Sequence, residues 1–228
     1  MIKAVIFDMY ETLITLYNAP VYFSSQMAAD AGIPEDIFRT AWHETENERT
    51  LGRVTADEVI TRILKENHCF SEEMTNRIME KRIACKREAF AHMHSEIIPM
   101  MEELKKRGMK IALISNCFSE EAMAIKESIL YPYFDAVCLS YDEGLRKPDR
   151  EIFRLCLDRL KLGAEECLYV GDGGSDELVA AANIGIYPVQ AVWYLKDGTS
   201  QPAKRMVKYK GADTPLQVIS MINAMNGD

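Results

Sequence analysis

The sequence has no apolar stretch that could cross a lipid bilayer. A membrane-spanning helix needs roughly 18 or more predominantly apolar residues, and no uncharged apolar run in these 228 residues approaches that length. The N-terminal residues also lack the architecture of a cleavable signal peptide. We therefore expect a cytoplasmic protein that has no membrane partner.

Paired cysteines are missing as well. The six cysteines include no Cys-x-x-Cys pair and are scattered among apolar neighbours, which is typical of reduced and mostly buried thiols. Neither a disulfide framework nor a structural zinc site is expected. His92 and His94 have no cysteine or acidic partner at metal-ligand spacing, so we interpret them as a surface or hinge pair.

Positive charge is the scarcer sign. The chain has 27 lysines and arginines against 35 aspartates and glutamates, which gives a net charge of −8 at pH 7. Nucleic acids bind basic surfaces, and none is therefore expected as a partner. The basic residues Lys204, Arg205, Lys208 and Lys210 form a short run that we interpret as a solvated loop.

What the sequence does contain is an apolar run that ends in a carboxylate. The residues from Ala4 to Phe7 are uniformly apolar, and Asp8 follows them. A short apolar run without alternation is typical of a parallel strand that is covered on both faces. Open α/β sheets place ligands beyond the carboxyl ends of such strands, so Asp8 is expected at a ligand-binding edge.

The rest of the chain divides into two patterns. Residues 17–92 carry apolar residues at helical spacing, with a capping box at Thr55 and Glu58, and contain no strand that could join a sheet. From Ser95 onward, apolar strands alternate with helices, which indicates right-handed crossovers and a mostly parallel sheet. We therefore predict an α/β fold with a Rossmann-like, three-layer core, residues 1–16 and 93–228, and an inserted α-helical cap, residues 17–92.

Three of the apolar strands end in a polar residue that can take part in chemistry. These residues are Asp8, Ser115 and Asp172, and their side chains should converge at one edge of the sheet. Asp172 and Asp176 are four residues apart at a strand-to-helix turn that contains two glycines, so both carboxylates should lie near the same point. Hard oxygen ligands in this arrangement suit Mg²⁺.

Together these stretches resemble the four sequence motifs of the haloacid dehalogenase superfamily, whose members are hydrolases with an aspartate nucleophile. The resemblance extends from Lys3 to about Gly185. It implies that Asp8 attacks the substrate and forms a covalent intermediate that water later hydrolyses. The matching residues, in the order of the family motifs, are Asp8 and Thr12, then Ser115 and Asn116, then Lys147, then Gly171-Asp172-Gly-Gly-Ser-Asp176.

The same resemblance implies roles for the other motif residues. Ser115 would bind the transferring group with support from Asn116, Lys147 would hold the nucleophile and an anionic substrate together, and Thr12 would belong to the catalytic set. Carboxylates gathered in one cleft would repel one another, whereas a divalent cation and Lys147 would neutralise them. The implied ligands of Mg²⁺ are Asp8, Asp172, Asp176 and the backbone carbonyl of Tyr10.

Tyr10 departs from the commonest family pattern. Phosphatases of the superfamily have an aspartate at this position, and its proton transfers are worth about 10²–10⁴ in rate. A phenol with an unperturbed pKa of about 10 is a poor substitute. Haloacid dehalogenases of the superfamily have tyrosine here and need no metal, but they carry serine and asparagine in the stretch where this chain has Gly171-Asp172-Gly173. Glu11 is a conceivable replacement acid, although its neighbouring position should turn it away from the site.

The implied metal site decides between these readings. An unneutralised Asp172 beside Asp8 would repel the carboxylate of a haloacid, so we favour a Mg²⁺-dependent phosphatase that acts on a small phosphorylated or anionic substrate. Two alternatives stay open, namely a 2-haloacid dehalogenase and a catalytically weak binding or regulatory protein. We expect a monomer or a homodimer. Candidate substrate contacts in the predicted cap are Arg39, Arg49, Arg53, Tyr17 and Tyr22.

Overall fold

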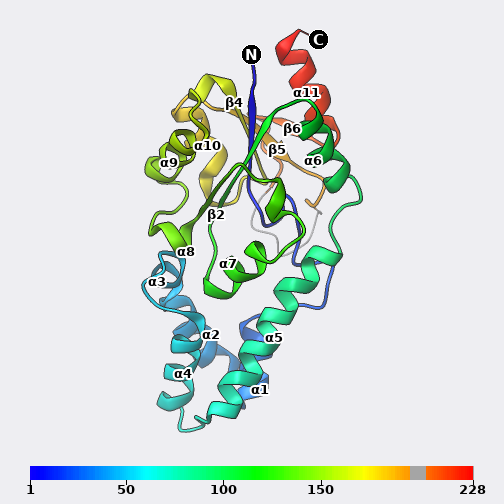
Figure 1. The fold of residues 1–228 in the computed structure, drawn as a ribbon. Helices are drawn as coiled ribbons and strands as arrows, with labels where there is room; N and C mark the ends of the chain where they lie inside the picture. Colours follow the sequence, from blue (N-terminus) through cyan, green and yellow to red (C-terminus); the bar gives the residue numbers. More distant parts are fainter. Residues whose placement is uncertain (196–203, 228) are drawn as a thin grey trace.

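The strands pair into one parallel sheet (Figure 1). The structure is a computed structural model that describes residues 1–195 and 204–227. Within these residues the strand order is β3-β2-β1-β4-β5-β6, and each pair of neighbours is parallel. The strands are β1 (Ala4–Phe7), β2 (Lys110–Ser115), β3 (Ala136–Leu139), β4 (Cys167–Gly171), β5 (Tyr187–Ala191) and β6 (Lys210–Ala212).

Helices cover both faces of this sheet (Figure 1). In β1, Val5 and Phe7 pack into one hydrophobic cluster, whereas Ala4 and Ile6 pack into another. Side chains alternate across a strand, so a uniformly apolar strand requires cover on both sides. This arrangement confirms the predicted α/β class and the parallel three-layer core. The covering helices are α6 (Ile97–Lys106), α7 (Ser119–Lys126) and α11 (Gln217–Asn226) on one face, and α9 (Arg150–Leu160) and α10 (Glu177–Asn183) on the other.

Between β1 and α6 the chain forms a helical unit, residues 24–91, which lies beyond the carboxyl end of β1 (Figure 1). Its apolar side chains, among them Phe38 and Ile63, form a third cluster. The predicted capping box is present, because the backbone N–H of Thr55 donates to the Glu58 carboxylate at 2.8 Å. None of the helices in the described residues is long and apolar enough to span a membrane. The helices of the unit are α1 (Ser24–Ala31), α2 (Glu35–Glu44), α3 (Glu46–Thr50), α4 (Ala56–Glu66) and α5 (Glu72–Ala91).

Buried charged side chains dock the helical unit on the sheet domain. Arg82 and Lys86 of α5 pair with Glu120 and Glu121 of α7, respectively, and Lys86 Nζ lies 2.8 Å from Glu121 Oε1. Each of these four side chains is at most 10% exposed. Removing one partner of a buried pair leaves an uncompensated charge, so such pairs hold their two helices in one specific arrangement.

Short elements account for the differences from the predicted secondary structure. The sequence predicts none of α3, α8 (Ser140–Glu143) and β6. The last of these begins at Lys210, within the run interpreted as a solvated loop, and Lys210 pairs with Val189 at the sheet edge. A strand of three residues is too short to show a recognisable alternation. Three 3-10 turns in the described residues complete the fold, namely η1 (Tyr131–Tyr133), η2 (Ala164–Glu166) and η3 (Gly174–Asp176).

Candidate active site

Three neighbouring strands deliver polar residues to one edge of the sheet. Asp8 follows β1, Asp172 follows β4, and Asn116 follows β2. Because β1 lies between β2 and β4, these strand ends are adjacent in space. Lys147 joins them from the segment between α8 and α9. The residues that line the resulting cavity of about 150 Å³ are Asp8, Tyr10, Glu11, Asn116, Lys147, Asp172, Gly174 and Ser175.

Lys147 is the cation at the centre of this site. It is 2% exposed, and its ammonium group lies 2.6 Å from Asp8 Oδ1 and in direct contact with Glu177. It also donates a hydrogen bond to the Tyr169 hydroxyl at 3.2 Å. The Asn116 side chain holds the backbone of Lys147 from both sides, accepting from its N–H at 2.8 Å and donating to its carbonyl at 3.0 Å. The predicted supporting role of Asn116 therefore has a structural basis in the placement of Lys147.

Three carboxylates gather beside this ammonium group, and two of them, Asp8 and Glu177, contact it. Asp8, Asp172 and Glu177 are buried, and each offers an oxygen within 4.8 Å of those of the other two. Burial, and then the charge of Glu177, raises the pKa of Asp8 to about 7 and that of Asp172 to about 8. Burial would lower the pKa of Lys147, but the charges of Asp8 and Glu177 outweigh it and raise that pKa. Full ionisation of these carboxylates therefore calls for a further positive charge, and their hard oxygen donors fit a site for a divalent cation such as Mg²⁺.

The carboxylate that joins Asp8 and Asp172 in this cluster is that of Glu177, not that of Asp176. Asp176 is exposed, has a φ of 51° and does not line the cavity, whereas its neighbour Ser175, with a φ of 58°, does. Glu177, in the first turn of α10, is fully buried. A Cβ at Gly171 would lie 2.1 Å from Glu177 Oε1, and this glycine therefore makes room for the Glu177 carboxylate. The structure does not bring Asp176 together with Asp8 and Asp172.

Tyr10 and Thr12 follow Asp8 in the loop after β1. Tyr10 lines the cavity, and its buried hydroxyl has no hydrogen-bond partner among the described residues. Burial, followed by the charge of Glu121, raises the pKa of Tyr10 well above its ordinary value, which makes it a poor acid or base at neutral pH. The Thr12 hydroxyl is likewise buried without a partner in the described part of the chain, whereas its carbonyl accepts a hydrogen bond from Trp193 Nε1 at 2.8 Å.

Ser115 and Glu11 differ from their predicted orientations. Ser115 is fully buried, its hydroxyl faces the carbonyl of Asn116 at 3.5 Å, and it does not belong to the lining of the cavity. The sequence predicts that the Glu11 side chain points away from the site, but Glu11 lines the cavity. Its φ of 57° reverses the side-chain direction that alternation along an extended chain would give. Its carboxylate accepts hydrogen bonds from Thr15 Oγ1 at 2.6 Å and from the N–H of Leu16 at 3.0 Å. These contacts assign the Glu11 side chain to the folding of the loop.

The candidate substrate contacts of the predicted cap, residues 17–92, lie outside the cavity. None of Arg39, Arg49, Arg53, Tyr17 and Tyr22 belongs to its lining within the described residues. Arg49 is fully buried between the rings of Trp42 and Phe118, 3.6 Å and 4.0 Å from their centroids. Its cation therefore contributes to docking the helical unit on the start of α7.

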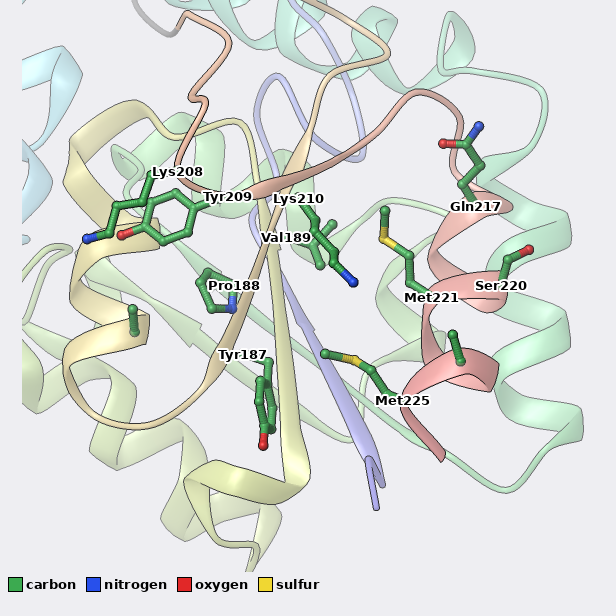
Figure 2. Close-up of a pocket in the computed structure, with 12 residues that line it drawn as sticks. Tyr187, Pro188, Val189, Lys208, Tyr209, Lys210, Gln217, Ser220, Met221 and Met225 are labelled. Atoms are coloured by element: carbon green, nitrogen blue, oxygen red, sulfur yellow. The ribbon is translucent and has the colours of Figure 1, made fainter. Parts of the chain in front are cut away.

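A separate and larger groove lies at the edge of the sheet that β5 and β6 form. Its volume is about 670 Å³, and it is bounded by β5, β6 and α11. Figure 2 shows Met221 and Met225 projecting from α11 toward the strand that carries Val189, with Lys210 beside them. The described residues that line it include no carboxylate, so this groove lacks the nucleophile and the metal donors that the smaller cavity has.

The burial of Asp172 has a measurable cost in stability. Its pKa is raised from 3.8 to about 8 in the folded state, so its contribution to stability is complete below about pH 4 and is lost as the pH rises through about 8. Asp172→Asn mimics the protonated form. In the presence of a chelator, we expect the free energy of unfolding of Asp172→Asn to rise relative to that of the parent protein between pH 5 and pH 8. The rise is at most about 1.4 kcal/mol per pH unit.

Urea unfolding of both proteins at pH 5, 6.5 and 8 measures this difference. We also expect Mg²⁺ to stabilise the parent protein at pH 8 and to leave Asp172→Asn unchanged, because the variant lacks a charged ligand. Parallel stability curves for the two proteins over this pH range would contradict the raised pKa.

Comparison with known proteins agrees with this geometry. The family model of the haloacid dehalogenase-like hydrolases matches residues 2–185. (S)-2-haloacid dehalogenase 4A of Burkholderia cepacia is 27% identical over 197 residues, which cover 83% of this chain and 82% of the relative. Glyceraldehyde 3-phosphate phosphatase of Methanocaldococcus jannaschii is 31% identical over 103 residues, which cover 45% of each protein. The chain spans about half the length, or less, of most curated relatives that it matches.

A solved structure with the same fold extends over the whole chain. The crystal structure of 2-haloacid dehalogenase from Pseudomonas syringae pv. Tomato DC3000 superimposes with a TM-score of 0.68 at 20% sequence identity. The superposition covers 99% of this chain and all of the other. The relatives therefore include both dehalogenases and phosphatases, and the choice between these two activities depends on the site.

Proposed function

This chain belongs to the haloacid dehalogenase-like hydrolases, and from that premise we propose that it is a Mg²⁺-dependent phosphatase of small phosphomonoesters. The observation that carries the proposal is the cluster of buried carboxylates at the cavity. Three buried carboxylates, Asp8, Asp172 and Glu177, lie together, and the ammonium group of Lys147 contacts two of them, Asp8 and Glu177. A divalent cation would balance this charge and allow an anionic phosphate to approach.

Asp8 is the proposed nucleophile. Lys147 Nζ and the N–H of Met9 both contact Asp8 Oδ1, at 2.6 Å and 2.7 Å. We therefore assign the attack to Oδ2, which forms a bond to phosphorus while the bond from phosphorus to the alcohol oxygen breaks. Water then attacks the aspartyl phosphate, which releases inorganic phosphate and restores the carboxylate. Bound Mg²⁺, held by Asp8, Asp172 and a main-chain carbonyl at Tyr10, would supply charge stabilisation for the phosphoryl oxygens.

Protonation of the leaving group is the weak step. The buried phenol of Tyr10 keeps its proton tightly, and the Glu11 carboxylate is engaged by Thr15 and Leu16. We therefore propose that the leaving oxygen takes its proton from water. The rate should then depend steeply on the acidity of the leaving alcohol.

The helical unit suits the role of a cap that closes over the cavity. We propose that residues 17–92 form this cap and that it limits the size of the substrate. A cavity of about 150 Å³ corresponds to the volume of one small aromatic molecule. A substrate that fits it has a phosphate group and few further atoms. A cytoplasmic location belongs to the same proposal, since all six cysteines are free thiols.

A haloacid dehalogenase is the second candidate. Tyr10 favours this activity, because expulsion of a halide needs no proton. A relative that is named a dehalogenase also matches 83% of this chain. The acidic pair Asp172 and Glu177 argues against it, because a haloacid would add a further carboxylate to a cluster whose burial and mutual repulsion already raise the pKa of Asp172 to about 8.

Phosphate release from a panel of esters tests these proposals. With Mg²⁺ we expect release from small esters, faster for 2,2,2-trifluoroethyl phosphate than for ethyl phosphate by about 10²-fold or more, because the general acid is missing and the two alcohols differ in acidity but little in size. A chelator should abolish both rates. Metal-independent halide release from 2-chloropropionate, without any phosphate release, would establish the dehalogenase instead. Failure of beryllium fluoride and Mg²⁺ to stabilise the protein would indicate a catalytically inactive binding protein.

A further inference from the structure

Tyr194 connects the two chain segments that join the helical unit to the sheet. The first segment leads from the loop after β1 to α1, and the second leads from α5 to α6. The hydroxyl of Tyr194 accepts a hydrogen bond from the backbone N–H of His94 at 2.6 Å and donates one to the carbonyl of Leu13 at 3.4 Å. One phenol therefore holds the two crossing points, residues 13 and 94, against each other.

The neighbourhood of this phenol is buried and well bonded. Tyr194 is 4% exposed, and burial raises the pKa of its hydroxyl to about 12, so that it retains the proton it donates to Leu13. The adjacent Trp193 donates from Nε1 to the carbonyl of Thr12 at 2.8 Å. The Trp193-Tyr194 pair thus fixes the loop that begins at Asp8.

The second crossing is anchored on its own side. The N–H of Glu96 donates to His94 Nδ1 at 3.1 Å, and the Glu96 carboxylate accepts from the N–H of Leu216 at 3.1 Å. His92, by contrast, faces Glu88 at 2.9 Å on the exposed surface of α5. The two histidines interpreted as a surface or hinge pair therefore differ, and His94 is the one at the joint.

We propose that Tyr194 is a positioning residue, which holds the helical unit over the cavity by joining residues 13 and 94. Its contribution to turnover rests on the proposed function. Without the hydroxyl, the part-buried N–H of His94 and the buried carbonyl of Leu13 lose this partner, and the helical unit populates positions in which the cavity is not closed. The apparent affinity for substrate decreases in proportion to the fraction of molecules in which the cavity is closed. The rate of the chemical step in the closed state is unchanged.

Tyr194→Phe tests this role, with Tyr209→Phe as the matched control. The Tyr209 hydroxyl is also buried but has no hydrogen-bond partner in the described residues. Three quantities are measured in the chain of residues 1–228: the exchange rate of the His94 amide, the kinetic constants for a small phosphate ester, and the Mg²⁺ concentration that stabilises the fold. For Tyr194→Phe we expect amide exchange and KM to rise by about tenfold, with kcat within about twofold. The Mg²⁺ response should be unchanged, and Tyr209→Phe should match the parent protein throughout.

Separate outcomes overturn the two proposals. Unchanged exchange at His94 in Tyr194→Phe overturns the positioning role, and so does a loss of kcat at constant KM, since a smaller folded fraction produces that pattern. If the parent protein releases no phosphate from any ester, the proposed function fails. The exchange comparison then still decides whether Tyr194 holds the joint.

Discussion

Asp8→Asn is expected to lower kcat for phosphate ester hydrolysis by about 10⁴-fold or more, because an amide cannot form the covalent intermediate. The variant should fold. Asn has nearly the same shape, and burial together with Glu177 raises the pKa of Asp8 to about 7, so the parent carboxylate is itself a costly charge in this site. Steady-state phosphate release with Mg²⁺ measures the effect. Thermal unfolding with beryllium fluoride and Mg²⁺ measures formation of the phosphate mimic on Asp8, which we expect in the parent protein and not in the variant.

Asp158→Asn is the matched control for this substitution. Asp158 is an exposed aspartate of α9 and does not line the cavity. Its replacement removes the same charge and should leave kcat within about twofold, since exposed substitutions away from special features have small effects. If Asp8→Asn retained a tenth or more of the parent activity, another group would have to be the nucleophile.

Lys147→Met is expected to destabilise the folded protein by about 3–5 kcal/mol, because it removes one partner of a buried ion pair and leaves the other uncompensated. Asp8 and Glu177 both contact the ammonium group directly, and Lys147 is 2% exposed. Turnover should fall at least about 10²-fold as well, because the nucleophile loses the donor that orients Oδ1. Urea unfolding and phosphate release measure the two effects.

The pH dependence of this variant has a definite sign. Without the ammonium group, the pKa of Asp8 rises beyond its value of about 7 in the parent protein. A raised carboxyl pKa means that stability is present at low pH and is lost as the pH rises through that pKa, so the destabilisation should be larger at pH 8 than at pH 6. Adding Glu177→Gln to Lys147→Met should restore part of the stability, because it removes one of the uncompensated charges.

Lys126→Met is the control for a solvent-exposed ion pair. Lys126 lies 2.8 Å from Asp142, and its side chain is 45% exposed. Such pairs contribute about 0–1 kcal/mol. An equal loss of stability in Lys126→Met and Lys147→Met would contradict the special role of the buried cluster.

The main features of the site could be predicted because they depend on short-range pattern. An apolar strand that ends in a carboxylate needs no long-range information, and Asp8 and Asp172 stand where that pattern predicts. Parallel strands present their carboxyl ends at the same edge, so convergence follows from strand type alone. The order of the motifs adds Asn116 and Lys147, both of which line the cavity.

Side-chain direction in the loops depended on backbone geometry that the sequence pattern does not show. Positive φ angles at Glu11, Ser175 and Asp176 reverse the facing of the residues around them. Glu11 enters the cavity lining for this reason, and Glu177 replaces Asp176 in the carboxylate cluster. Residues other than glycine rarely have a positive φ, so the residue types at these positions predict the commoner negative φ.

By itself the sequence determined the sheet, the strand-end carboxylates and the family, since hydrophobic periodicity and motif order are local properties of the chain. The tertiary structure decided which charged side chains pack between domains and which line the cavity. Arg49 is enclosed between Trp42 and Phe118, and Tyr194 joins residues 13 and 94, which are far apart in the sequence. Such contacts depend on how distant elements pack, and their energies come from burial in a common environment rather than from neighbouring residues.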